Sequence, residues 1–127
     1  MNVVDSSGWL EYFTDGENAD FFAPAIEDTP NLIVPVICVY EVFKRILQTQ
    51  GIDVAEVRIA DLHNGKMIDL TVPLALSAAT LSAELKLPMA DSLILATARA
   101  NEATLWTQDE HFKELEGVKY IEKKYSS

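Results

Sequence analysis

The sequence predicts a single α/β domain, in which helices cover both faces of a central parallel sheet to form a three-layer α/β/α sandwich. Short runs rich in β-branched residues alternate with longer segments of helical period, which is typical of strand-helix repetition. The 127 residues, 49% of them hydrophobic, suit one globular domain with its own core. No linker, low-complexity tract or internal repeat interrupts the chain. We therefore expect residues 1–127 to form one domain.

The expected elements follow one another in strand-helix order. Short β-branched or apolar runs predict strands at 2–4, 32–34, 67–70, 104–106 and 118–121. Segments of helical period predict helices near 7–14, 19–27, 36–50, 54–63, 73–86, 90–101 and 110–115.

Local signals support several of the helix ends. Asp53 and Glu56 have the spacing of a capping box, which places a helix start at this point. Pro73 suits the first turn of a helix, where its missing N–H has no helical partner. Glycines that follow helical stretches indicate helix ends, at Gly51, Gly65 and Gly117.

The net charge of −10 argues against a protein that holds nucleic acid through many basic contacts. The charge is uneven, because residues 1–43 contain eight acids and no Lys or Arg. The same segment contains five of the eleven aromatic residues: Trp9, Tyr12, Phe13, Phe21 and Phe22. Helical spacing makes the core the default place for these rings, and a groove for a partner is a second possible use.

The beginning of the sequence has no basic stretch followed by an apolar segment, and no apolar run approaches the ~18 residues of a membrane span. We therefore expect a soluble protein of the cytoplasm with no membrane association. Cys38 is the only cysteine, so an intrachain disulfide is impossible and a buried, inert thiol is expected. The spacing of Cys38, His63 and His111 is not that of zinc ligands.

Four acids fall just after a predicted strand or at the start of a helix. Asp5 follows the first strand, Glu41 lies one turn into the helix after the second, Asp91 begins a helix and Asp109 follows the fourth strand. Parallel sheets bind ligands in the crevice at the carboxyl ends of their strands. The sequence therefore predicts that these four carboxylates converge there.

Each acid also has a purely structural explanation. Three of them could cap a helix or stabilise a turn. Glu41 could form a surface pair with Arg45, and Thr107 with Glu110 could cap the helix after the fourth strand. These explanations give no reason for all four acids to occupy the same place in the strand-helix unit.

Convergence of carboxylates is unfavourable unless a cation is present. Two carboxylates about 4 Å apart repel by roughly 4 kcal/mol at an effective dielectric constant of 20. Ligation by oxygen alone favours Mg²⁺ or Mn²⁺ over zinc. Such an ion activates water and stabilises the leaving oxygen, so phosphodiester hydrolysis is the chemistry that the pattern indicates.

Four motifs together resemble the PIN-domain family, and most closely the toxin ribonucleases of VapBC-type toxin-antitoxin pairs. The motifs are VVDSS, PVICVYEVFK, PMADSLILATA and LWTQDEHF, with their acids 36, 50 and 18 residues apart. The resemblance implies a PIN-like fold and an Mg²⁺ or Mn²⁺ site on Asp5, Glu41, Asp91 and Asp109. It also implies accessory hydroxyls at Ser6 and Thr107.

The resemblance further implies a homodimer that cleaves RNA by metal-activated water. A cognate antitoxin would inhibit it by laying a peptide across the protein, often with a basic side chain delivered to the acids. The acid-rich segment 1–43 is consistent with a basic partner. Four bases near the motifs are possible phosphate contacts, with surface solubility as the alternative: Lys44, Arg45, Arg99 and Lys113.

Two other functions are considered. A PIN-like protein could serve interaction without catalysis, although all four acids are present. A receiver-like Mg²⁺-binding switch is also a single acidic α/β domain, but it needs an acid pair after the first strand. Here serines follow Asp5, and Asp69 lies within MIDL.

Overall fold

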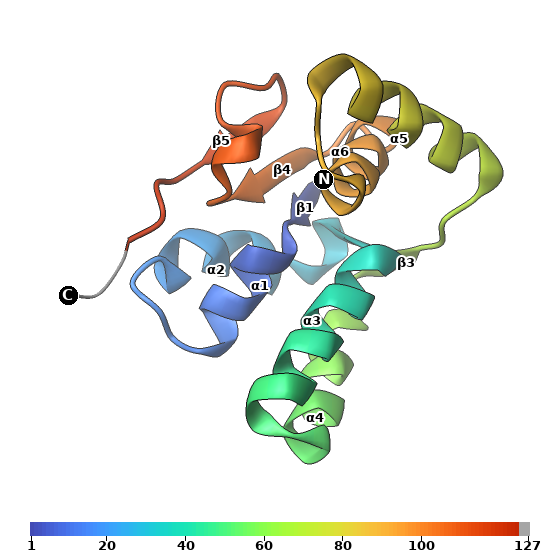
Figure 1. Cartoon of the computed structure of the whole chain (residues 1–127). Helices are drawn as coiled ribbons and strands as arrows, with labels where there is room; N and C mark the ends of the chain where they lie inside the picture. Colours follow the sequence, from blue (N-terminus) through green and yellow to red (C-terminus); the bar gives the residue numbers. More distant parts are fainter. Residues whose placement is uncertain (125–127) are drawn as a thin grey trace.

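The computed structural model describes residues 1–124 and confirms the predicted α/β class, with helices around a five-stranded parallel sheet (Figure 1). The strands are β1 (Asn2–Val4), β2 (Leu32–Pro35), β3 (Lys66–Ile68), β4 (Thr104–Thr107) and β5 (Val118–Tyr120). The helices are α1 (Ser6–Phe13), α2 (Ala19–Glu27), α3 (Val36–Gln50), α4 (Ile52–Leu62), α5 (Val72–Leu85) and α6 (Met89–Ala100). Two short 3₁₀ turns complete the fold, η1 (Thr29–Asn31) and η2 (Glu110–Phe112).

Helices cover both faces of the sheet. Every residue of β2 is buried, which is typical of a parallel strand with helices on both sides. On one face α6 packs across β1, β2 and β4, and α5 packs outside α6. On the other face α2 contacts the sheet through Phe21, whose ring lies 5.3 Å from that of Trp106. Trp9 and Phe22 are completely buried, so the core is the main place for the N-terminal aromatic rings.

The strand order is β3-β2-β1-β4-β5, and every neighbouring pair is parallel. The chain runs outward from β1 to β2 and β3, and then returns to the other side of β1 to form β4 and β5. The order therefore reverses between β1 and β4, and ligands of open α/β sheets bind in the crevice at such a reversal. Receiver domains have the order 2-1-3-4-5, so the topology contradicts the receiver-like alternative.

Most predicted elements are present with ends shifted by one or two residues. The largest difference is the helix expected at 110–115, which is only the 3₁₀ turn η2. The capping box of Asp53 and Glu56 is also wrong, because α4 begins at Ile52 and Gly51 occupies its N-cap. Gly51 has φ +88°, a conformation that favours glycine, and it separates α3 from α4. Pro73 lies in the first turn of α5, as expected.

Two further sequence expectations have direct structural outcomes. Cys38 is completely buried beneath the sheet end, where burial raises the pKa of its thiol far above the usual range. This confirms the inert, buried cysteine. Within residues 1–124, no helix has both the length and the hydrophobicity that crossing a membrane requires.

Candidate metal centre

Asp5 lies at the reversal of strand order, directly after β1. Its backbone N–H donates to the Trp106 carbonyl of β4 at 3.0 Å, which joins the two strands at this edge. The residue is only 3% exposed. Its Oδ2 accepts hydrogen bonds from Ser7 Oγ and Thr107 Oγ1, both at 2.9 Å. Its Oδ1 has no donor among residues 1–124, so one oxygen of a buried carboxylate is available to a ligand.

The environment of Asp5 opposes its negative charge. Burial is the largest effect and raises the pKa of Asp5 from 3.8 to about 7. The hydrogen bonds from Thr107 and Ser7 lower the pKa in part, while the charges of Asp91 and Asp109 raise it further. Three carboxylates from distant parts of the chain therefore share one electrostatic environment.

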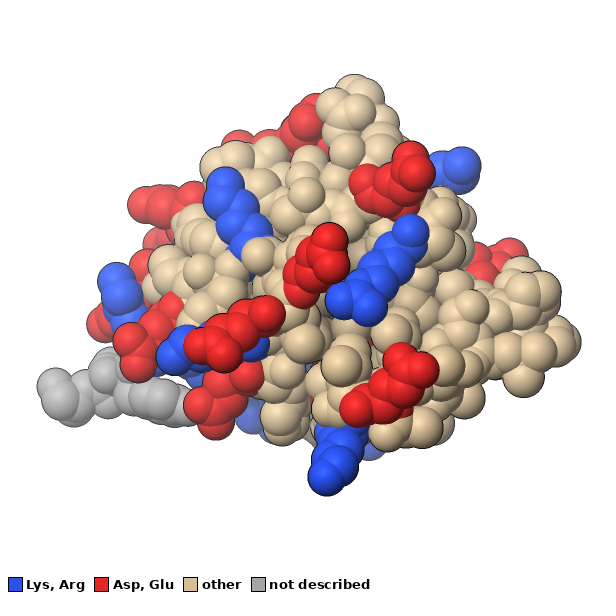
Figure 2. Space-filling view, turned by 90° about the horizontal axis from the view of Figure 1, so that it is seen from above, with Lys and Arg blue, Asp and Glu red and all other residues tan. Residues whose placement is uncertain are grey.

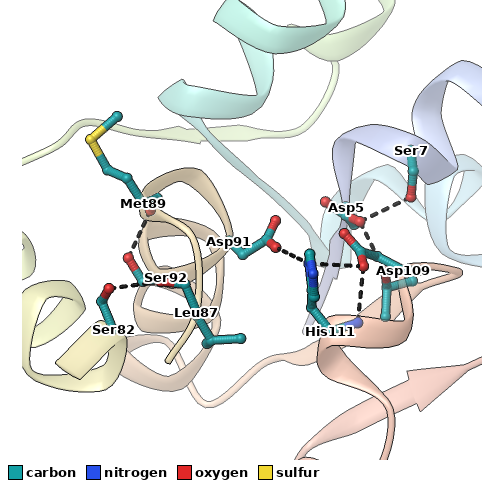
Figure 3. A network of polar contacts seen from close by, with 10 residues as sticks. Asp5, Ser7, Ser82, Leu87, Met89, Asp91, Ser92, Asp109 and His111 are labelled. Atoms are coloured by element: carbon teal, nitrogen blue, oxygen red, sulfur yellow. Dashed lines mark hydrogen bonds and ion pairs between the residues drawn. The ribbon is translucent and has the colours of Figure 1, made fainter. Parts of the chain in front are cut away.

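The His111 ring lies between the carboxylates of Asp91 and Asp109 (Figure 3). His111 Nδ1 lies 2.9 Å from Asp91 Oδ2 and 3.2 Å from Asp109 Oδ1. One ligand atom from each of the three residues lies within 4.8 Å of the other two. Among residues 1–124 this is the group whose geometry could hold a metal ion.

The pKa shifts of this group follow from crowding and burial. Desolvation raises the pKa of Asp91, the charge of Asp109 raises it further, and the His111 hydrogen bond lowers it in part. The hydrogen bond with Asp91 and the charge of Asp109 together raise the pKa of His111. Burial is the largest cause for Asp91, and the charge of Asp109 adds to both shifts; a cation would offset that charge.

Two serine hydroxyls fix the helix start that carries Asp91. Ser82 Oγ donates to the Leu87 carbonyl, and Ser92 Oγ donates to the Met89 carbonyl, each at 2.7 Å (Figure 3). These bonds hold the turn between α5 and α6. Asp91 then lies in the first turn of α6, with its side chain 14% exposed.

Glu41 lies on α3 and contacts the first residue of α1. Its Oε1 accepts a hydrogen bond from Ser6 Oγ at 2.7 Å. The predicted surface pair with Arg45 is not formed, since no ion pair joins the two within the described chain. The charge of Glu41 contributes to the raised pKa of Asp91, so it belongs to the same acidic environment. Glu41 and Asp5 nevertheless lie outside the tight group of Asp91, Asp109 and His111.

Capping explains one of the acids. Asp109 is the N-cap of η2 and accepts from the His111 backbone N–H at 2.9 Å. Asp5 occupies the N-cap position of α1, and Asp91 lies three residues after the N-cap Pro88, but neither side chain makes a capping hydrogen bond. Thr107 does not form a capping box with Glu110. Its hydroxyl instead donates to Asp5 and accepts from the Asp109 N–H.

Two residues beside the predicted acids were not singled out from the sequence. His111 lies within the acidic group, so a nitrogen is among the atoms that could bind a metal there, together with the expected oxygens. Its position two residues after Asp109 was the available signal. Ser7, and not Ser6, binds Asp5, whereas Ser6 binds Glu41.

Gln108 also supports the site and was not anticipated. The residue is buried between Thr107 and Asp109, and its Nε2 donates to Glu11 Oε2 at 2.9 Å. Its Oε1 accepts from Asn18 Nδ2, also at 2.9 Å. This network ties the loop that carries Asp109 to α1 and to the start of α2.

The four candidate phosphate contacts lie in different places. Arg45 lines a groove of about 390 Å³ that reaches the site at Ser7 and Gln108. Lys44 lies beside the Tyr40 ring, and Lys113 beside the Tyr120 ring, at 5.8 and 5.9 Å. Arg99 lies two turns beyond Asp91 on α6, about 12 Å along the axis, and donates to the Glu116 carbonyl. We therefore do not retain Arg99 as a contact of this site.

The visible surface has no continuous basic field. Figure 2 shows acidic and basic side chains interspersed over one face, with uncharged surface between them. A second hollow, of about 350 Å³, adjoins Asp109 on the other side of Ser7 and Gln108, and Lys123 lines both hollows. The basic side chains that line these two hollows are Arg45 and Lys123.

The donor set fits a divalent cation. Asp5 supplies a carboxylate oxygen without a protein donor, and Asp91 and Asp109 supply oxygens within reach of one another. Carboxylates and one imidazole suit Mg²⁺ or Mn²⁺, which also retain water and substrate oxygens as ligands. An ion held there could polarise a phosphoryl oxygen or activate water.

Comparisons with known proteins agree with this architecture. The structure of a toxin-antitoxin complex from Klebsiella pneumoniae is similar, with a TM-score of 0.76 and 24% identity over 93% of this chain and 95% of that chain. VapBC2 from Rickettsia felis, bound to a promoter DNA fragment, has a TM-score of 0.72 and 15% identity over 95% and 97%. VapC20 from Mycobacterium tuberculosis, a sarcin-ricin loop cleaving toxin, has a TM-score of 0.71 and 15% identity over 88% and 92%.

At these identities the structural likeness shows a shared fold. No curated protein sequence gives a significant match to the chain. The family model of the PIN domain, however, matches residues 3–118. This range includes all four acids and the strand β4, which pairs with β1 where the strand order reverses. The chain therefore belongs to the PIN-domain family.

Proposed function

We propose that the protein is a metal-dependent endoribonuclease that acts as the toxin of a toxin-antitoxin pair. The proposal rests on the close group of Asp91, Asp109 and His111, with Asp5 in the same electrostatic environment where the strand order reverses. Structural relatives described as toxins support the toxin role, and one of them is described as cleaving the sarcin-ricin loop.

The acids would hold Mg²⁺ or Mn²⁺, which supplies an activated water and offsets the charge on the leaving oxygen. Asp5, Asp91 and Asp109 bind the cation through carboxylate oxygens. The Thr107 hydroxyl donates to the Asp5 carboxylate and accepts from the backbone N–H of Asp109. One side chain therefore aligns two of the acidic residues. The hydroxyl of Ser6 orients Glu41, which adds a fourth acidic side chain to the site.

A single metal site can act on RNA despite the net charge of −10. The cation supplies positive charge where the phosphate must bind, so a basic surface is not needed for the chemical step. Arg45 is the best placed of the candidate phosphate contacts, because it lines the groove that reaches Ser7. Weak long-range attraction implies that RNA binding depends on the metal more than on salt.

The groove beside the site suits a partner peptide such as an antitoxin. It combines apolar side chains, including Leu10 and Phe13, with the acidic side chain of Glu11. Residues 1–43 contain acidic residues but no Lys or Arg, which favours a basic segment in the partner. Such a peptide could extend along the groove and place a basic side chain against Asp5 and Asp109. The cytoplasm is the compartment where such a ribonuclease would meet its RNA.

A homodimer is supported by an exposed apolar face. Val72 and Leu76 on α5 are 74% and 65% exposed, and Tyr40 on α3 is 61% exposed. Val36 and Leu70 are also exposed, and they line a small apolar pocket together with Leu74 of α5. Leu76→Asp is expected to shift the protein from dimer to monomer in sedimentation at micromolar concentration. Wild type that sediments as a monomer there would contradict the dimer.

The test of the function is incubation of the purified protein with total RNA in Mg²⁺, in Mn²⁺ and in excess chelator. We expect discrete cut ends with either metal and none with chelator, and restored cleavage when metal is added back. Cleavage that persists in chelator would contradict the metal-dependent mechanism. Absence of cleavage under all conditions, by protein that binds metal normally, would favour the non-catalytic alternative.

A further inference from the structure

We propose that His111 is a direct ligand of the divalent cation, through Nδ1, and that this nitrogen shifts the preference of the site from Mg²⁺ toward Mn²⁺. The inference rests on the proposed function, since it concerns the same metal centre. It adds a ligand that the four acidic motifs do not include.

The distances around His111 suit neighbouring corners of an octahedral site. With metal-ligand bonds of about 2.1 Å, adjacent ligand atoms of an octahedron lie about 3.0 Å apart. Nδ1 lies 2.9 Å from Asp91 Oδ2 and 3.2 Å from Asp109 Oδ1. All three atoms lie within 4.8 Å of one another, so they can bind one ion when Nδ1 carries no proton.

The ring is held in this position by its own backbone. The His111 N–H donates to Asp109 Oδ1 at 2.9 Å, in the turn that η2 forms around Asp109. Ring and backbone of one residue thus both contact the same carboxylate oxygen. This arrangement positions His111 before any cation binds, which reduces the free energy needed to order the ligand.

Asp5 offers a further carboxylate oxygen beside the group of Asp91, Asp109 and His111. Asp5 is 3% exposed, and both of its hydrogen bonds end on Oδ2. Its Oδ1 accepts no hydrogen bond from residues 1–124. Among the described residues, Asp5 Oδ1 is not one of the fully buried side-chain atoms that lack a partner, so this oxygen is open to a ligand.

The identity of the preferred ion follows from the chemistry of the donor. Mg²⁺ favours oxygen ligands and retains water, whereas an imidazole nitrogen binds transition metals more readily. A site with three carboxylates and one imidazole should therefore bind Mn²⁺ better than an all-carboxylate site does. The competing explanation is that His111 is a cationic side chain that occupies the place of the metal and leaves when metal binds.

Pulsed electron paramagnetic resonance of the Mn²⁺-loaded protein distinguishes these explanations. We expect strong coupling of a ring nitrogen to Mn²⁺ in wild type, its loss in His111→Gln, and its retention in His63→Gln. His63 is a matched control because it is exposed at the end of α4. In calorimetric titrations, the ratio of Mn²⁺ to Mg²⁺ affinity should fall by about tenfold or more in His111→Gln alone.

Mn²⁺ that binds wild type without nitrogen coupling would overturn the inference, and so would an unchanged or higher affinity ratio in His111→Gln. Failure of the proposed function gives a different result. In that case wild type binds neither ion, or Asp91→Asn binds Mn²⁺ as tightly as wild type, and both proposals are rejected together.

Discussion

Asp91→Asn is expected to lower the rate of RNA cleavage by at least about 10³-fold, which corresponds to about 4 kcal/mol of transition-state stabilisation. The substitution removes a carboxylate ligand and one negative charge from the group of Asp91, Asp109 and His111. Metal ions contribute several kcal/mol to such reactions through charge stabilisation, so loss of a ligand has a large effect. Rates on a defined RNA at saturating Mg²⁺ and Mn²⁺ measure the change.

The fold should survive this substitution. The carboxylate of Asp91 carries an unfavourable charge next to Asp109, and its side chain makes no capping hydrogen bond in α6. Thermal unfolding without metal should therefore give an equal or higher Tm. Asp53→Asn is the matched control, because it removes the same charge from an exposed position in the first turn of α4. Equal cleavage by Asp91→Asn and Asp53→Asn would show that Asp91 has no part in the reaction.

Asp5→Asn is expected to stabilise the metal-free protein at pH 8 while abolishing its stabilisation by metal. The folded protein raises the pKa of Asp5 from 3.8 to about 7, so between these values the folded state holds a proton that the unfolded state has lost. The free energy of unfolding of wild type therefore falls as pH rises through this window. The penalty is complete above pH 7 and amounts to at most about 4 kcal/mol.

Asparagine carries no charge, so the variant lacks this penalty and should keep the hydrogen bonds from Ser7 and Thr107. Urea unfolding in chelator should give similar stability for both proteins at pH 4 and a more stable variant at pH 8. Mn²⁺ should then stabilise wild type only, more strongly as pH rises toward 7. An identical pH dependence of the two proteins would show that Asp5 is ionised at no cost in the fold.

The sequence predicted that these acids lie near one another because three of them are tied to strand and helix ends. Asp5 directly follows β1 and Asp109 lies two residues after β4, and parallel strands present their carboxyl ends to one edge whatever their order. Asp91 required the helix start to be identified, and the start expected at residue 90 lies one residue from the observed start at Met89. The strand order itself depends on contacts between distant segments, and the sequence alone did not provide it.

The orientation of individual side chains was beyond the sequence. Successive helical residues point about 100° apart, so a shift of one residue in the start of α1 exchanges the roles of Ser6 and Ser7. Helix α1 was expected from residue 7 and begins at Ser6. His111 escaped notice for a related reason, since a six-residue helix was expected where only the tight turn η2 forms. That turn is what directs the ring back toward Asp109.

The central claim is that one divalent cation joins carboxylates from distant parts of the chain. Anomalous diffraction from Mn²⁺-soaked crystals tests it directly. We expect one strong peak between the carboxylates of Asp5, Asp91 and Asp109. A peak elsewhere, or none at a Mn²⁺ concentration that supports RNA cleavage, would contradict the claim.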